Sequence, residues 1–182
     1  MADLSRHYHL ATGIAISDGR LLMVASQYSS HAQPLWNLPG GRQQPGELLA
    51  ETVVREVFEE TGLRVEAGEV AYVSESYDGD THYLNVAFVV NVSGGSSFDS
   101  AQDDKGLRQD HKRLRHDDIT HDTVSVDHVV AVEWVPIDEV AERIIVAVVR
   151  EPLLAYLRGE LRGRYAGYHD AGITIEWPPE SR

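Results

Sequence analysis

The segment from Glu47 to Thr61 constrains the fold most, because its hydrophobic residues recur with the period of an α-helix. They form one apolar arc, which comprises Ala50, Val53, Val54, Val57 and Phe58. Gly62 follows at the point where a helix would end in the left-handed conformation. The sequence therefore predicts an amphipathic helix over 47–61 that packs one face against a core.

Three glutamates share the edge of that arc. Glu56, Glu59 and Glu60 fall within roughly 100° of one another on the helix, where like charges repel by about 0.2–0.5 kcal/mol per pair. Carboxylates that converge form an oxygen-rich site of the kind that binds Mg²⁺ or Mn²⁺, and a bound ion would offset the repulsion. A solvated acidic face is the alternative, and the spacing alone favours neither.

A glycine-rich loop in front of the helix shifts this balance towards a ligand site. Gly40 and Gly41 allow the backbone to approach a ligand closely, and a metal beside bare backbone suits a diphosphate. Arg55 lies four residues after Glu51 and four before Glu59. An ion pair that holds Glu59 in position is therefore favoured for Arg55 over direct contact with a substrate.

The rest of the chain is dominated by strand patterns. Strands are expected over His7–Ser17, Arg20–Tyr28, a short stretch from Leu35, then 64–77, 81–92 and 128–136, with tight turns at Asp18-Gly19 and Asp78–Asp80. A second helical stretch is expected over 138–157, interrupted near Pro152. This order predicts an α/β (α+β) sandwich, in which helices cover a mixed sheet.

One domain is expected over residues 1–158, followed by a C-terminal extension over 159–182. Residues 93–127 are polar and dense in charges of both signs, which predicts a long mobile insertion between two strands. Four histidines in or beside it are expected to be solvated rather than to bind metal: His111, His116, His121 and His128. Strand-like residues at 171–177 predict a homodimer, because an extra strand needs a partner.

Composition narrows the function classes. A net charge of −13 argues against binding of nucleic acid, whose phosphates demand a basic surface. The sequence shows neither a signal-peptide pattern nor an apolar run long enough to span a membrane, so a cytoplasmic location is expected. The absence of cysteine excludes disulfides, thiolate metal sites and a cysteine nucleophile.

Residues Gly41 to Leu63 resemble the Nudix box at every defined position. Five residues separate Gly41 from Glu47, and seven more lead to Arg55-Glu56-Val57-Phe58-Glu59-Glu60-Thr61-Gly62-Leu63. The stretches WNLPGG and VEWVPIDEV also look like parts of that family. The resemblance covers about 8–158 without the insertion. It implies the αβα Nudix sandwich, a Mg²⁺ or Mn²⁺ requirement, and hydrolysis of a nucleoside diphosphate linked to another moiety.

The resemblance also implies roles for individual residues. The metal ligands would be Glu56, Glu59, Glu60, a backbone carbonyl of Gly41 or Gly40 and, in a supporting or orienting place, Glu47. Arg55 would orient the glutamates. The general base would be Glu60, Asp122 or Asp127, of which Glu60 is favoured. Gln44 departs from the family, which often has glutamate at this position.

The resemblance leaves the substrate open. Nucleoside triphosphates, ADP-ribose and nucleotide sugars all fit, because the stretch YDGDTHY lacks the residues that mark two substrate classes. The alternative is a non-catalytic Nudix-fold nucleotide sensor, although such proteins usually have eroded boxes. An isomerase on this scaffold would need cysteine. Four aromatic residues would stack on a base or pack in the core, and packing is favoured: Tyr28, Trp36, Tyr77 and Tyr83.

Overall fold

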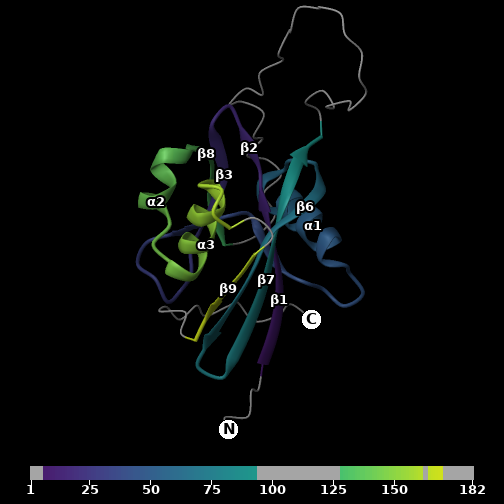
Figure 1. Cartoon of the computed structure of the whole chain (residues 1–182), viewed down its shortest axis with the longest axis vertical. Helices are drawn as coiled ribbons and strands as arrows, with labels where there is room; N and C mark the ends of the chain where they lie inside the picture. Colours follow the sequence, from purple (N-terminus) through teal and green to yellow (C-terminus); the bar gives the residue numbers. More distant parts are fainter. Residues whose placement is uncertain (1–5, 94–127, 162–163, 170–182) are drawn as a thin grey trace, which may run out of the picture.

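The computed structural model describes residues 6–93, 128–161 and 164–169, and their strands form two sheets (Figure 1). The first sheet has the order β5-β1-β7-β6-β9. Its strands are β1 (Arg6–Ile14), β5 (Gly40–Arg42), β6 (Val65–Asp78), β7 (Thr81–Val92) and β9 (Arg164–Tyr168). The pairs β1–β7 and β6–β9 are parallel and the other two antiparallel, so this sheet is mixed, as predicted.

The second sheet is built around β3. Its strands are β2 (Ile16–Ser17), β3 (Arg20–Ser26), β4 (Leu35–Asn37) and β8 (Val129–Pro136). All three partners pair with β3 in antiparallel fashion. Among the described residues the sandwich thus contains two sheets, where the sequence predicted one.

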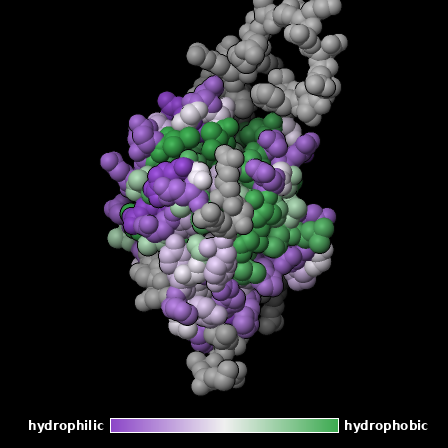
Figure 2. Space-filling model, viewed as in Figure 1, coloured by the Kyte–Doolittle hydropathy of each residue, from purple (hydrophilic) through white to green (hydrophobic). Residues whose placement is uncertain are grey.

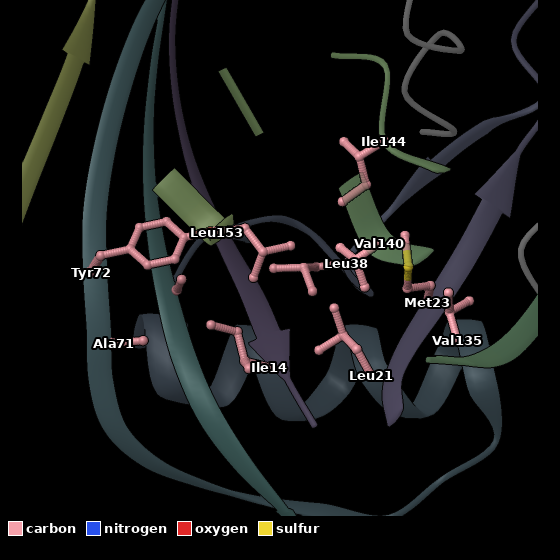
Figure 3. Packing of buried hydrophobic residues seen from close by; sticks show 11 residues of the cluster. Ile14, Leu21, Met23, Leu38, Ala71, Tyr72, Val135, Val140, Ile144 and Leu153 are labelled. Carbon is pink, nitrogen blue, oxygen red and sulfur yellow. The ribbon is translucent and has the colours of Figure 1, made fainter. Parts of the chain in front are cut away.

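Helices cover both sides of these sheets. They are α1 (Leu49–Thr61), the 3-10 helix η3 (Ile137–Glu139), α2 (Val140–Arg143) and α3 (Ala147–Leu157). Val53 and Val57 of α1 pack with Ala11 of β1 in one buried cluster. On the other side, Tyr72 of β6 and Leu153 of α3 belong to a second cluster, in which Figure 3 shows side chains from strands and helices converging. This two-sided packing confirms the predicted αβα arrangement.

The predicted helix beside the glycine loop is present as α1. It begins at Leu49, two residues later than predicted, because the side chain of Glu51 accepts a hydrogen bond of 2.8 Å from the N–H of Leu48. This is half of a capping box, since leucine offers no side-chain acceptor in return. Gly62 ends the helix with φ of 73°, the left-handed cap that the sequence predicted.

The predicted hairpin around Asp18-Gly19 is only partly correct. The turn exists, with φ of 49° and 72° at its two central residues, and it joins β2 to β3. The predicted first strand, however, divides at Ala15. Its long first part is β1, which pairs with β7 in the other sheet instead of forming the hairpin. By contrast, the hairpin predicted around 78–80 is confirmed by the pairing of β6 with β7.

The second helical stretch is interrupted at a different place from the one predicted. The break lies between α2 and α3, at Ile144–Val146, and Ile144 there adopts an extended backbone while its side chain is buried. Pro152 lies inside α3, so the helix tolerates the loss of one backbone donor. Burial of Ile144 and Pro152 in the core therefore overrides the tendency of proline to interrupt a helix at its own position.

The predicted insertion over 93–127 lies, except for Ser93, outside the described residues, as does the strand-like stretch 171–177. The sequence missed β9, which falls within the predicted extension and pairs with the edge of β6. The strand-like stretch on which the homodimer was predicted is not the strand β9, so the homodimer stays a prediction. The boundary at residue 158 also stays a prediction.

No helix among the described residues is long and apolar enough to cross a bilayer. The surface in Figure 2 combines hydrophilic regions with hydrophobic patches. Exposed large hydrophobic side chains include Leu48, at 68% exposure, and Ile145.

Candidate functional site

Arg55 is the centre of a carboxylate network that joins the middle and end of α1 to the loop before it. Its Nε and Nη2 donate to the two oxygens of Glu47, at 2.6 and 3.0 Å. Its Nη1 donates to Glu56 at 2.8 Å and to Glu59 at 2.9 Å. The predicted ion pair with Glu59 is therefore present. Arg55 also aligns Glu47, which precedes it, and Glu56, which follows it.

Glu47 is held by more than the arginine. One of its oxygens also accepts hydrogen bonds from the backbone N–H of Gln44, at 3.0 Å, and from the hydroxyl of Thr52, at 2.9 Å. The bond from Arg55 lowers the pKa of Glu47 most, and together these donors bring it to about 2. Reciprocally, Glu47 raises the pKa of Arg55. In this geometry Glu47 positions the loop and the arginine.

We expect Glu47→Gln to remove an acid-sensitive part of the stability. Because the folded pKa is lowered, the contribution of Glu47 is fully present above the unfolded value of 4.5 and is lost as the pH falls towards 2. Near neutral pH the variant should unfold with about 1–2 kcal/mol less free energy, a value reduced for solvent screening. Urea unfolding at pH 7 and pH 3 measures the difference, which should shrink at the lower pH.

Glu66→Gln is the matched control, because Glu66 is an exposed glutamate on β6. This variant should leave stability unchanged at both pH values. A stability loss in Glu47→Gln that is equally large at pH 3 and pH 7 would contradict the proposed ion-pair origin.

Glu60 is the buried member of the box, with 3% of its surface exposed. Its Oε2 accepts a hydrogen bond of 2.8 Å from the N–H of Gly40. Burial raises the pKa of Glu60 well above its usual value, although the bond from Gly40 acts in the opposite direction. A buried carboxylate with a raised pKa beside a glycine loop has the properties of a group that exchanges protons or binds a cation.

His128 lies beside Glu60 and corrects a prediction. Its Nε2 is 4.0 Å from Oε1 of Glu60, its ring stacks on Tyr28, and its side chain is 22% exposed. The sequence interpretation as a solvated histidine was wrong, because β3 and the start of β8 bring Tyr28 and His128 together. The other three histidines singled out with it lie outside the described residues.

Gly41 fits tightly against Glu56. A β-carbon on Gly41 would lie 2.6 Å from the carboxylate of Glu56, so the carboxylate occupies the space that any other residue would need. Burial raises the pKa of Glu56, while Arg55 acts in the opposite direction. The glycine loop therefore brings bare backbone next to Glu56 and Glu60, as the sequence predicted.

The carboxylate oxygens of this site are of the type that binds a divalent metal ion. Three carboxylates contact one guanidinium group, and a fourth, that of Glu60, is bound to the glycine loop. This leaves an excess of negative charge, and hard cations bind such oxygens. Among the described residues, however, no three acidic or histidine side chains lie close enough to hold one ion together. Arg55 stands between Glu56 and Glu59. Glu59, whose side chain is 37% exposed, is held by Arg55 and would leave this ion pair to bind an ion.

A cleft begins at the glycine loop, on the α3 side of the first sheet. Gly40 and Gly41 line one end of it, so the cleft adjoins the glutamates that these glycines contact. Its floor is formed by side chains of β1, β6 and β7, and the start of α3 forms a wall. None of the glutamates of the box is among the described residues that line the cleft, so the two glycines connect it to the carboxylates.

The four aromatic residues singled out in the sequence separate into two groups. Tyr28 and Tyr83 line the cleft. Trp36 packs against the core, with the guanidinium of Arg143 5.0 Å above its ring, and Tyr77 stacks on His82. Tyr83 stacks on Tyr8 and also lines the cleft, so the preference for packing over base stacking stays a prediction for this residue.

Sequence reasoning missed three polar residues of the cleft. Thr12, Asn37 and Asn85 line it and were not singled out. Thr12 and Asn85 are polar residues within apolar strand patterns, and that contrast was the available signal. Asp122 and Asp127, two of the residues considered as general base, lie outside the described residues.

Comparisons with known proteins agree with this geometry. The family model described as NUDIX domain matches residues 7–157. A putative 8-oxo-dGTP diphosphatase of Bacillus subtilis is 35% identical over 77 residues, which are 41% of this chain and 49% of that protein. An ADP-ribose pyrophosphatase of Methanocaldococcus jannaschii is 34% identical over 85 residues, 46% and 50% of the two chains. The chain spans about half the length of these relatives.

Solved structures show the same fold. A NUDIX hydrolase from Nitrosomonas europaea superimposes with a TM-score of 0.62 at 20% identity, covering 87% of this chain and 93% of that one. A MutT protein from Methanosarcina mazei gives a TM-score of 0.58 at 20% identity, with 85% and 95% covered. With the family model matched over most of its length, the box complete and the sandwich formed, this chain belongs to the Nudix family.

Proposed function

We propose that the protein is a Mg²⁺-dependent pyrophosphohydrolase that cleaves a nucleoside diphosphate linked to another moiety. The observation that carries this proposal is the position of the cleft. The cleft ends at the glycine loop. Gly40 of this loop contacts the buried Glu60, and Gly41 contacts the half-buried Glu56. A nucleotide in the cleft would therefore present its diphosphate to the carboxylates. The names of the relatives, which include a diphosphatase and a pyrophosphatase, support the same reaction class.

Glu56, Glu59 and Glu60 would hold the metal, with Glu47 and the backbone of Gly41 in supporting places. Bound Mg²⁺ or Mn²⁺ would supply charge neutralisation for the diphosphate and a more acidic water. Arg55 keeps Glu47, Glu56 and Glu59 aligned when the site is not fully loaded, since it contacts all three.

Glu60 is the proposed general base. Its carboxylate is buried beside the glycine loop, where it could take a proton from a water molecule and release it after cleavage. Water would attack a phosphorus atom of the anhydride, the bond to the bridging oxygen would break, and no covalent enzyme intermediate is required. The N–H of Gly40 keeps the Glu60 carboxylate facing the loop.

A substrate panel tests the reaction. We expect phosphate release, measured through a coupled phosphatase, from one substrate class among triphosphates, ADP-ribose, nucleotide sugars and dinucleoside polyphosphates. Removal of divalent ions with EDTA should lower this turnover by about 100-fold or more, because the metal supplies several kcal/mol of transition-state stabilisation. Added Mg²⁺ should restore it.

Binding without turnover would contradict the proposal. If calorimetry detects a nucleotide at the cleft while no panel member is cleaved with Mg²⁺ or Mn²⁺, the non-catalytic sensor becomes the better description. Small-molecule nucleotides are the proposed partners in both cases. The cytoplasmic location and the absence of a nucleic-acid partner remain predictions from charge and sequence.

A further inference from the structure

The walls of the cleft suit a flat, uncharged ring. Among the described residues that line it there is no lysine, arginine or histidine. Tyr28 and Tyr83 contribute aromatic surfaces, and Leu38, Val146 and Val149 contribute aliphatic ones. A further phosphate group would have no cationic side chain to bind among these residues. A nucleobase, by contrast, could stack on the aromatic rings and pack against the aliphatic side chains.

Asn85 lies in the floor of this cleft, and one side of its amide is hydrogen-bonded to Thr12. It stands on β7, where it pairs with Leu10 of β1 and Ser74 of β6. The hydroxyl of Thr12 donates a hydrogen bond of 3.3 Å to Oδ1 of Asn85. The carbonyl side of the amide is thereby engaged, and the amino side, which carries two donors, remains for a ligand.

Asn37 repeats this arrangement at the glycine-loop end. Its Oδ1 accepts a hydrogen bond of 2.7 Å from the N–H of Leu38, so its amino group is also the side left for a ligand. Both amides of the cleft therefore offer donors. The hydroxyls of Ser74 and Ser76 rotate and impose no direction of their own.

The two carboxylates that border the cleft do not cancel this preference. Asp78 lies four residues along β6 from Ser74, or roughly 13 Å from the strand position opposite Asn85. Glu75 alternates with the cleft-facing serines, and its carboxylate is bound by His82, at 3.0 Å, and by Tyr165. A base above Asn85 would meet amide donors.

We infer that Asn85 recognises the carbonyl oxygen on C6 of guanine or on C4 of uracil. It would so select these oxo bases over the amino bases adenine and cytosine, which carry an amino group at the corresponding atom. This inference rests on the proposed function for its place in the reaction. The amino group of Asn85 would donate to the carbonyl oxygen, whereas an exocyclic amino group would place donor against donor. A polar group left unpaired in the cleft disfavours the wrong base.

Asn85→Asp tests the inference because it replaces the donor by an acceptor at nearly constant shape. In the unaltered protein kcat/KM should favour GTP over ATP, and UTP over CTP, by about tenfold or more. In Asn85→Asp the order should reverse within each pair. Asn91→Asp is the matched control, since Asn91 is exposed on the same strand, and it should keep the original order.

A second variant separates orientation from folding. Thr12→Val removes the hydroxyl that engages Oδ1, so the amide of Asn85 is free to turn and discrimination should fall towards unity. Unchanged preference in both Thr12→Val and Asn85→Asp, or an unaltered protein without preference, would overturn the inference.

Binding distinguishes this inference from the proposed function. Calorimetry with GDP, ADP, UDP and CDP needs no turnover. If these diphosphates bind with an oxo-base preference that Asn85→Asp reverses, while nothing is hydrolysed, the inference stands and the proposed reaction fails. Equal affinity within both pairs, or no binding of any of the four, would overturn the inference even if other substrates are cleaved.

Discussion

Glu60→Gln should abolish hydrolysis while the protein stays folded. Loss of the buried carboxylate removes both a proposed metal ligand and the proposed base, and we expect kcat to fall by about 1,000-fold. The amide oxygen of glutamine still accepts the hydrogen bond from Gly40, so the loop keeps its anchor. The neutral amide also avoids the cost of burying a charge. In EDTA the Tm of the variant should therefore equal or exceed that of the unaltered protein.

Glu51→Gln provides the comparison on the same helix. Glu51 is exposed, and glutamine preserves its hydrogen bond to the N–H of Leu48. Steady-state turnover with Mg²⁺ and thermal unfolding in EDTA should both be unchanged in this variant. Glu60→Gln that keeps more than about a tenth of kcat would exclude Glu60 as the base, because general-base catalysis alone contributes 10²–10⁴-fold.

The parts of the fold that the sequence predicts are those with local causes. The period of Val53 and Val57 specifies α1, and the left-handed freedom of Gly62 specifies its end. The turn at Asp18-Gly19 follows from the same freedom of backbone. In each case a few neighbouring residues determine the conformation, so no distant partner had to be known.

The parts that it does not predict depend on distant partners. Nothing near Ala15 signals that β1 leaves the hairpin, because its partner residues on β7 lie 75 positions further along the chain. The pairing of β9 with β6 is equally remote. Likewise the break at Ile144 follows from the burial of this side chain in the core, a tertiary effect that overrides local propensity.

The same division applies to the site. Arg55, Glu56 and Glu59 lie within one helix, so helical geometry alone predicts their neighbourhood. Asn85 and Thr12 are 73 residues apart and meet only because β1 and β7 pair. The cluster of carboxylates could therefore be predicted from spacing along the sequence. The proposed specificity residues could not, because their contact depends on how the strands of the sheet are paired.

Gly40→Ala should destabilise the protein by about 3 kcal/mol, because two separate costs combine at this position. Its φ of 153° is unfavourable for alanine, and a β-carbon would lie 2.3 Å from the backbone oxygen of Ala11, which cannot move aside. Gly46→Ala separates these costs, since Gly46 has φ of 91° but open space around it. In urea unfolding, Gly46→Ala should lower the free energy of unfolding by only about 1 kcal/mol.

Gly41→Ala should affect activity more than stability. Its free energy of unfolding should lie within about 1 kcal/mol of that of the unaltered protein, and kcat should fall about 100-fold. The three atoms nearest to its β-carbon would all belong to the carboxylate of Glu56, the movable end of a side chain, so the fold should adapt by displacing the proposed metal ligand. Urea unfolding and turnover of Gly40→Ala and Gly41→Ala, measured side by side, check this separation. Full activity in Gly41→Ala would show that the present position of Glu56 is irrelevant to catalysis. A stability loss as large as that of Gly40→Ala would show that the loop backbone, rather than Glu56, sets the limit on residue 41.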